Sequence, residues 1–143
     1  MNLIEPPPDA AWRFLVARGV HVAGGIERAF AVLDGHRCIG IVVLHGRDGE
    51  AVELSLALDA ARAATRRLWR HVVDEALAGA SALKVRTTPE NGLVREAARL
   101  MGASETVIPD GRGDGRDDVV GVVTRRAWRS SRFNRGGAKF DQS

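Results

Sequence analysis

The most regular pattern of apolar and polar residues lies between residues 51 and 58. There, Val52, Leu54, Leu56 and Leu58 alternate with Glu53, Ser55 and Ala57. A period of two is typical of a strand with one buried face. Asp-Gly pairs at 34–35 and 48–49 favour tight hairpin turns, because both positions tolerate a positive φ. The pattern therefore predicts three antiparallel strands, over 29–33, 37–45 and 51–58.

Residues 60–78 show a different period, with apolar side chains every three or four positions. This stripe consists of Ala64, Leu68, Trp69, Val72, Val73, Ala76 and Leu77. Such spacing predicts a helix that buries one face and exposes the other. Asp59 directly precedes the stretch and is the predicted N-cap, since a carboxylate can accept from the first helical amides.

Two shorter helices and three further strands complete the expected order of elements. One helix is predicted over 9–18, with Asp9 as its N-cap. The other begins with Thr88 as N-cap and Pro89 as first helical residue, and ends at Gly102. The strands are predicted over 83–86, 104–108 and 118–124.

Composition places the chain among single-domain globular proteins. It has 143 residues, of which 45% are hydrophobic and 27% charged. The single cysteine, Cys38, excludes an intramolecular disulfide and a zinc site built from paired thiolates. The four histidines are scattered, so no metal site is expected. No apolar run approaches the length of a membrane span, and we expect a location in the cytoplasm or within a particle.

Positive charge is concentrated at the C-terminus. Residues 125–143 carry a net charge of +5, so the rest of the chain carries −2. Because the body is nearly neutral, its charge does not indicate a nucleic-acid-binding surface over the whole domain. Trp128, Phe133 and Phe140 alternate with these cations, a composition suited to docking on an acidic protein groove. The sequence thus predicts a folded body over 1–126 and an extended tail over 127–143 that binds a partner or stays solvated.

The half of the chain from Ala51 to Ser104 carries a more specific pattern. An acid-bearing strand with Glu53 is followed by the turn 60–65, a long helix, a strand, Asn91 and a helix that ends at Gly102. This arrangement resembles the GNAT superfamily of N-acetyltransferases. The segment Thr65-Arg-Arg-Leu-Trp, with Asn91 and Gly102 at this distance, is most similar to small acetyltransferase-like proteins encoded by tailed bacteriophages. The resemblance implies an α/β (α+β) fold: a mixed, mostly antiparallel sheet flanked by helices.

The resemblance also implies acetyl-CoA as cofactor and assigns residues to it. The implied cofactor-binding residues are Leu56, Leu58, Arg62, Ala63, Ala64, Thr65, Arg66 and Asn91. A turn that opens a helix can present amides to a diphosphate, and most family members use glycines there. Here alanines replace the glycines, so the turn is either a degenerate phosphate loop or a helix start that packs closely on its neighbour. Asn91 either holds the pantetheine arm or supports the first helical turn.

Glu53 matches the family's catalytic base, which takes a proton from the acceptor amine. The alternative is an ordinary exposed strand residue. The family's usual acid, a tyrosine, falls at Ala98, and the chain contains no tyrosine.

Two functions follow from these patterns. The first is an acetyl-CoA-dependent N-acetyltransferase that acts on an unknown amine. The second is a catalytically inactive structural or docking protein of a phage particle, anchored by residues 127–143 to a protein partner.

Overall fold

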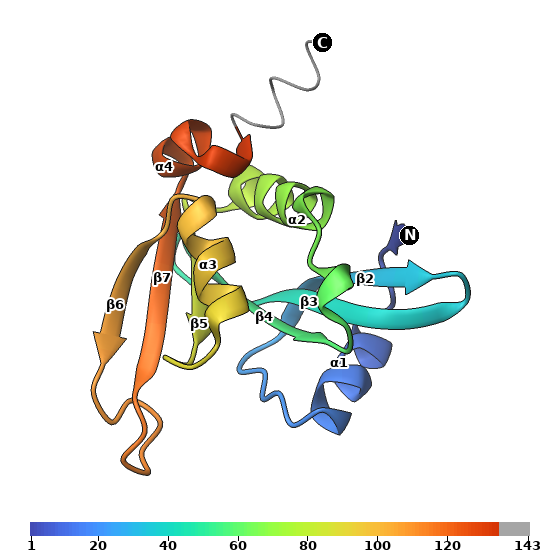
Figure 1. The fold of residues 1–143 in the computed structure, drawn as a ribbon, viewed down its shortest axis with the longest axis horizontal. Helices are drawn as coiled ribbons and strands as arrows, with labels where there is room; N and C mark the ends of the chain where they lie inside the picture. The colour runs from blue at the N-terminus through green and yellow to red at the C-terminus, as the bar shows by residue number, and fades with distance from the viewer. Residues whose placement is uncertain (135–143) are drawn as a thin grey trace.

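Seven strands and four α-helices make up residues 1–134, the part of the chain that this computed structural model describes (Figure 1). In chain order they are β1 (Asn2–Ile4), α1 (Pro8–Ala17), β2 (Ile26–Asp34), β3 (Arg37–Asp48), β4 (Ala51–Leu58), α2 (Arg66–Gly79), β5 (Ala82–Thr87), α3 (Gly92–Leu100), β6 (Ser104–Ile108), β7 (Asp118–Thr124) and α4 (Arg125–Ser130), with a 3₁₀ turn, η1 (Ala61–Ala63), before α2.

The strands form one sheet in the order β1-β2-β3-β4-β5-β7-β6. Every neighbouring pair is antiparallel except β4 and β5, which run parallel and are connected through α2. The predicted strands at 51–58, 104–108 and 118–124 are confirmed at both ends. The predicted fold class, a mixed and mostly antiparallel sheet flanked by helices, is therefore confirmed.

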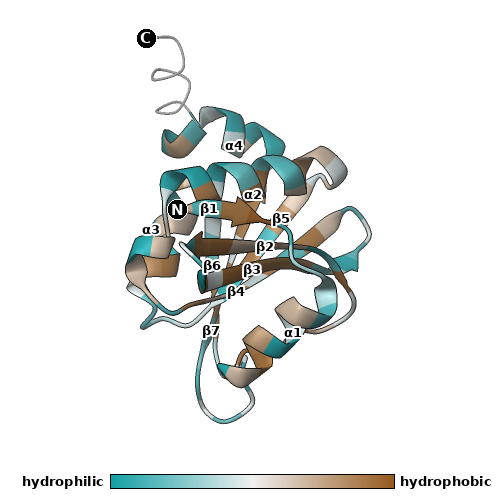
Figure 2. Ribbon diagram, turned by 90° about the vertical axis from the view of Figure 1, so that its right-hand side faces the viewer, coloured by the Kyte–Doolittle hydropathy of each residue, from teal (hydrophilic) through white to brown (hydrophobic). Residues whose placement is uncertain are grey.

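Helices cover both faces of the sheet (Figure 2). One core contains the apolar sides of α2 and α3 together with Val52 and Leu54 of β4. The other core is smaller and packs Leu15 of α1 against Val43 of β3 and Ala57 of β4. Because side chains alternate along a strand, even-numbered residues of β4 face α2, and odd-numbered residues face α1. The side chains of Glu53 and Ser55 consequently project on the α1 side.

All three predicted N-caps are wrong. The helix α1 begins at Pro8 after Pro7, so Asp9 lies inside its first turn and caps nothing. In the other two helices a different side chain caps the helix. The Oγ1 atom of Thr65 accepts from the amide of Leu68 at 3.1 Å, so α2 begins at Arg66 rather than at residue 60. The predicted cap, Asp59, instead forms a two-point ion pair with Arg18 at the end of α1, with distances of 2.6 and 2.7 Å. The 3₁₀ turn η1 lies between Asp59 and the start of α2.

The cap of α3 is likewise displaced from Thr88 to Asn91, and Pro89 precedes the helix instead of opening it. The Oδ1 atom of Asn91 accepts from the amide of Val94 at 3.2 Å. An Asn side chain competes well with Thr for this role, since it is among the best N-caps. The predicted end of this helix at Gly102 is two residues beyond the observed last helical residue, Leu100.

The C-terminal region contains a helix that the sequence analysis did not predict. Trp128 of α4 is only 4% exposed, and its indole Nε1 donates to Asp74 of α2 at 2.7 Å. The sequence analysis placed Trp128 in the extended tail, but its ring is buried by the chain's own body, so Trp128 belongs to the folded part. Phe133 also packs partly against the main core. Phe140 lies outside the described residues.

Within the described part of the chain, every helix is too short or too polar to cross a membrane.

Candidate functional site

The parallel pair β4 and β5 separates partway along the sheet. Their pairing runs from Ala51 and Ala82 to Leu54 and Val85, whereas β4 continues to Leu58. The amide of Asp59 donates to the carbonyl of Ile39 on β3 at 2.8 Å.

Backbone amides alternate in direction along a strand, so those of Leu56 and Leu58 point to the opposite edge, away from β3. There β5 has already diverged. The second half of β4 therefore presents backbone donors and acceptors that no neighbouring strand takes up.

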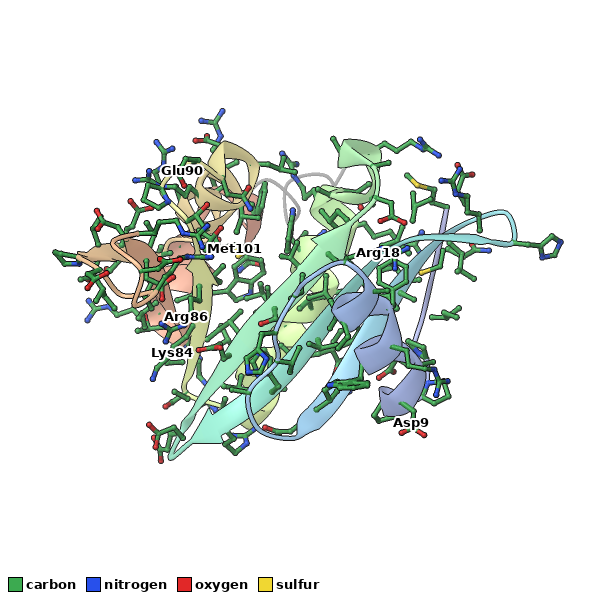
Figure 3. All side chains as sticks on the ribbon, turned by 90° about the horizontal axis from the view of Figure 1, so that it is seen from below. Asp9, Arg18, Lys84, Arg86, Glu90 and Met101 are labelled. Carbon is green, nitrogen blue, oxygen red and sulfur yellow. The ribbon has the colours of Figure 1, made fainter. Side chains whose placement is uncertain are left out.

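An open cleft of about 750 Å³ lies at this divergence. Its walls come from β4, the end of β5, the start of α3, the loop 19–23 and the loop 111–118. A second cavity of about 380 Å³ continues along β4 toward Asp59 and shares four lining residues with the first: Val20, Leu56, Asn91 and Val94. Figure 3 shows Arg86 on β5 and Arg18 at the end of α1, on either side of β4. Between them, the two cavities are lined by every residue of β4 from Glu53 to Leu58.

Three polar side chains, His45, Glu53 and Ser55, lie close together at the β3–β4 side of the cleft. The β3–β4 register places His45 opposite Glu53, and Ser55 follows two residues later on the same face. The Nε2 atom of His45 lies 2.7 Å from Ser55 Oγ and 3.6 Å from Glu53 Oε2. His45 is fully buried, whereas Glu53 and Ser55 line the cleft.

The loop before β2 fixes the orientation of the His45 ring. The carbonyl of Ala23 lies 2.7 Å from His45 Nδ1. A carbonyl oxygen only accepts, so Nδ1 carries a proton, and in the neutral ring Nε2 accepts the hydroxyl proton of Ser55. The loop can come this close because Gly24 and Gly46 face each other, and a Cβ on Gly24 would lie 3.1 Å from the Gly46 Cα.

Glu53 also contacts a cation. Its Oε1 lies 3.4 Å from Nε of Arg86, whose Nη1 donates to Asp118 at 2.6 Å. The hydrogen bond to Asp118, with the added charge of Glu53, raises the pKa of Arg86. Arg112 approaches the second Asp118 oxygen at 3.7 Å. The carboxylate of Glu53, with 19% of its side chain exposed, thus lies between a permanent cation and a buried imidazole.

The predicted phosphate turn is largely occupied by its own hydrogen bonds. The amides of Ala63, Ala64 and Thr65 donate to carbonyls of residues 60, 61 and 63. Ala63 is fully buried in the main core. Arg62 extends outward and pairs with Asp34 at 2.8 Å.

Arg66 begins α2, and its guanidinium lies 5.9 Å from the centre of the Phe133 ring. Neither cavity at the divergence is lined by any of residues 60–66. The structure therefore brings Leu56, Asn91 and Glu53 together at the cleft, with Leu58 in its continuation, and places the turn residues beyond its end.

Of the two alternatives expected for Asn91, the structure shows the support of the first helical turn. Its side chain caps α3 through the amide of Val94, and it also lines both cavities.

Four residues of the site were not predicted from the sequence: His45, Ser55, Arg86 and Asp118. The odd-numbered alternation in β4 did pair Ser55 with Glu53 on one face. What was missing was the strand register that sets His45 opposite Glu53. No group of three or more potential ligand side chains within residues 1–134 is arranged to hold a metal ion.

The solved structures that this chain resembles include several acetyltransferases. The chain is similar to an IAA acetyltransferase from Bacillus cereus, with a TM-score of 0.69 and 16% identity over 86% of this chain and 98% of that one. It is also similar to the spermidine/spermine N-acetyltransferase SpeG from Vibrio cholerae, with a TM-score of 0.71 and 13% identity over 91% and 99% of the two chains.

A third similar structure is RimJ from Mycobacterium smegmatis in complex with CoA-disulfide. Its TM-score is 0.63, with 15% identity over 92% of this chain and 66% of that chain. The sequence itself matches no protein-family model and no curated protein. The likeness is therefore one of fold.

Proposed function

We propose that this chain is an acetyl-CoA-dependent N-acyltransferase that binds its acyl donor along the free edge of β4. The observation that carries the proposal is the divergence of β4 and β5, which opens a cleft directly beside Glu53. The names of the structural neighbours support this reaction, since they include several acetyltransferases and one protein in complex with CoA-disulfide.

The residues present fit the donor's pantetheine arm well. Its amide groups need hydrogen-bond partners spaced as in a strand, and the backbone groups of Leu56 and Leu58 face the open edge with that spacing. Asn91 adds a polar side chain on the opposite wall. Binding here would satisfy backbone groups that β5 leaves without a partner.

The diphosphate would lie at the start of α2, where the helix dipole and nearby cations favour an anion. Arg62 and Arg66 supply the charge. Because three amides of this turn donate within the turn itself, fewer of them can turn toward phosphate than in a glycine-rich loop. We therefore propose a degenerate phosphate loop and a weaker affinity for the donor than such a loop gives.

Glu53 provides the proton acceptor for the incoming amine. Its carboxylate lines the cleft, with Oε1 3.4 Å from Nε of Arg86, and an ionised carboxylate can accept a proton. The acceptor amine would enter between the loops 19–23 and 111–118, which form the outer walls of the cleft.

The docking protein of a phage particle, with residues 127–143 as its anchor, stays a prediction, as does the likeness to phage-encoded proteins. Burial of Trp128 removes one of the three aromatic residues on which that arm depended. No observation in residues 1–134 favours docking over acyl transfer.

Thermal unfolding with and without acetyl-CoA tests the proposal. A ligand at 100 times its Kd, bound only to the folded state, adds about 2.7 kcal/mol of stability. For a chain of this length we expect Tm to rise by roughly 5–10 °C. The E53Q variant should show the same rise but lose transfer to an amine.

A second variant, Leu56→Pro, should remain folded yet lose the rise in Tm. Proline removes the amide donor at the open edge, where no strand hydrogen bond depends on it, and also a side chain that packs partly against the main core, so some loss of stability is expected. The matched variant Ala57→Pro should destabilise the sheet, since that amide faces β3. An unchanged Tm of the natural chain at millimolar acetyl-CoA would contradict the proposed function.

A further inference from the structure

We propose that the acceptor amine carries a carboxylate, and that Arg112 binds this carboxylate while Glu53 receives the amine. This inference rests on the proposed function and names the chemical class of its acceptor. It is carried by the way in which the charged side chains of the cleft are paired.

These side chains are balanced in number but not in pairing. Three carboxylates and three guanidinium groups line the cleft: Glu53, Asp114, Asp118, Arg86, Arg112 and Arg116. Two ion pairs among them are close. Nη1 of Arg86 donates to Asp118 at 2.6 Å, and Nε of Arg116 donates to Asp114 at 2.8 Å. One carboxylate and one guanidinium group therefore stay outside the two close pairs.

The carboxylate outside these pairs is that of Glu53. Its Oε1 accepts one long hydrogen bond, of 3.4 Å, from Nε of Arg86. Its Oε2 lies 3.6 Å from Nε2 of His45, but this nitrogen accepts the hydroxyl proton of Ser55 and has no proton to donate in the neutral ring. Ser55 Oγ keeps its lone pairs for the cleft. An ammonium group that enters here thus meets two acceptors, the Glu53 carboxylate and Ser55 Oγ.

The guanidinium outside the close pairs is that of Arg112. Its Nε lies 3.7 Å from Oδ1 of Asp118, which is beyond hydrogen-bond distance. Within residues 1–134 this is its one contact with a carboxylate. Asp118 is already paired with Arg86, so Arg112 adds a second positive charge beside it. A guanidinium presents its N–H groups as a planar fork, which suits a bound carboxylate.

The loop 111–118 holds Arg112 at the wall of the cleft. The amide of Arg112 donates to the carbonyl of Arg116 at 3.2 Å, and the amide of Asp110 donates to the carboxylate of Asp117 at 3.1 Å. Gly111 lets the loop approach the sheet closely, because a Cβ there would lie 2.7 Å from the Asp118 Cβ. The position of the Arg112 backbone is therefore fixed by the loop's own contacts.

Charge balance then selects among amines. The charges of Glu53, Arg86, Asp118 and Arg112 cancel one another, so a bound ammonium leaves this cluster with a net positive charge. A second ammonium on the same molecule would add to that charge and meet Arg112 with like sign. A carboxylate on the same molecule restores neutrality and gives Arg112 a partner. The cleft is thus suited to an amino acid or an acidic peptide rather than to a diamine.

The test compares three acceptors of similar chain length that differ in the charge of the far end. These are γ-aminobutyrate, its carboxamide and putrescine, each with acetyl-CoA and the full chain. Release of CoA thiol should give the highest kcat/KM for γ-aminobutyrate and the lowest for putrescine. A series of ω-amino acids from glycine to aminohexanoate varies the spacing between amine and carboxylate, and its optimum reports the span between Glu53 and Arg112.

Variants of Arg112 assign the preference to this side chain. Arg112→Gln should lower kcat/KM for the carboxylate acceptors about 10- to 100-fold, the usual effect of losing a charged hydrogen bond, and should affect the carboxamide much less. Arg112→Glu should reverse the order of γ-aminobutyrate and putrescine. Arg99→Gln is the matched control, since it makes the same change in net charge on α3, where Arg99 pairs with Glu96 at 2.8 Å outside the cleft. The control should keep the natural preference, and all three variants should keep the acetyl-CoA-induced rise in Tm.

A carboxylate can also enter the cleft on the acyl group. Succinyl-CoA with propylamine, which carries no carboxylate, distinguishes this source. If Arg112→Gln impairs succinyl transfer to propylamine but not acetyl transfer to γ-aminobutyrate, the carboxylate belongs to the donor and the acceptor class is overturned.

The remaining outcomes separate this inference from the function on which it rests. Equal kcat/KM for the three acceptors, or an equal effect of Arg112→Gln on all of them, would overturn the acceptor class and leave acyl transfer standing. A rise in Tm with acetyl-CoA but no acetylation of any ω-amino acid would also count against the acceptor class. Absence of any stabilisation by acetyl-CoA would overturn the proposed function, and this inference with it.

Discussion

Trp128 offers a quantitative test of where the folded body ends. Its indole is buried against α2 and donates to Asp74 at 2.7 Å. Trp128→Phe keeps most of the buried ring but removes this donor. A hydrogen bond to a charged group contributes about 1.5–3 kcal/mol, and the low end applies because Asp74 is exposed and regains water. We expect a loss of about 1.5–2 kcal/mol, and about 3–5 kcal/mol for Trp128→Ala.

Urea unfolding and calorimetry measure both losses. For a chain of this size, Trp128→Phe should lower Tm by about 3–8 °C. Trp12→Phe is the matched control, because Trp12 is 50% exposed on α1 and the same exchange there should stay within about 0.5 kcal/mol. If the two variants unfold alike, Trp128 does not anchor α4, and residues from 127 onward behave as the solvated tail that the sequence predicted.

Three further predictions concern the cleft and its supports. Asn91→Ala should cost about 1 kcal/mol, because it removes the cap of α3, whereas Asn91→Ser should keep the stability. A smaller acetyl-CoA-induced rise in Tm for Asn91→Ser would show that Asn91 also holds the donor. Gly46→Ala should lower the free energy of unfolding more than Gly49→Ala, since both glycines have positive φ but only at Gly46 would a Cβ meet a carbonyl, at 3.3 Å. The hydrogen bond from Arg18 lowers the pKa of Asp59, so this pair stabilises the fold fully above about pH 3.9, the ordinary Asp pKa, and ceases to do so as the pH falls through the lowered value. Asp59→Asn should remove that part of the acid dependence in unfolding experiments, and an unchanged acid profile would count against it.

The sequence predicted those elements whose boundaries depend on local patterns. Strict alternation defined 51–58, and turn residues bounded 104–108 and 118–124. The start of α2 depends on a distant residue instead. Asp59 is a good cap by composition, but Arg18, from a helix 41 positions earlier, holds its carboxylate.

The candidate site was predicted in part for the same reason. Glu53, Leu56 and Asn91 could be named from the resemblance, since each lies at a recognisable place in an element. His45 could not, because it reaches Glu53 only through the β3–β4 register. That register shifts between His45 and Asp48, so counting from the Asp-Gly turn misplaces the partner.

In the proposed function, the free edge of β4 receives the acyl donor. The most direct test of this binding is an NMR titration of the ¹⁵N-labelled chain with acetyl-CoA, following the backbone amides of β4. We predict that the amide signals of Leu56 and Leu58 shift in proportion to occupancy, while those of β1, at the far edge of the sheet, stay in place. Unchanged signals for both β4 amides at saturating donor would contradict the account.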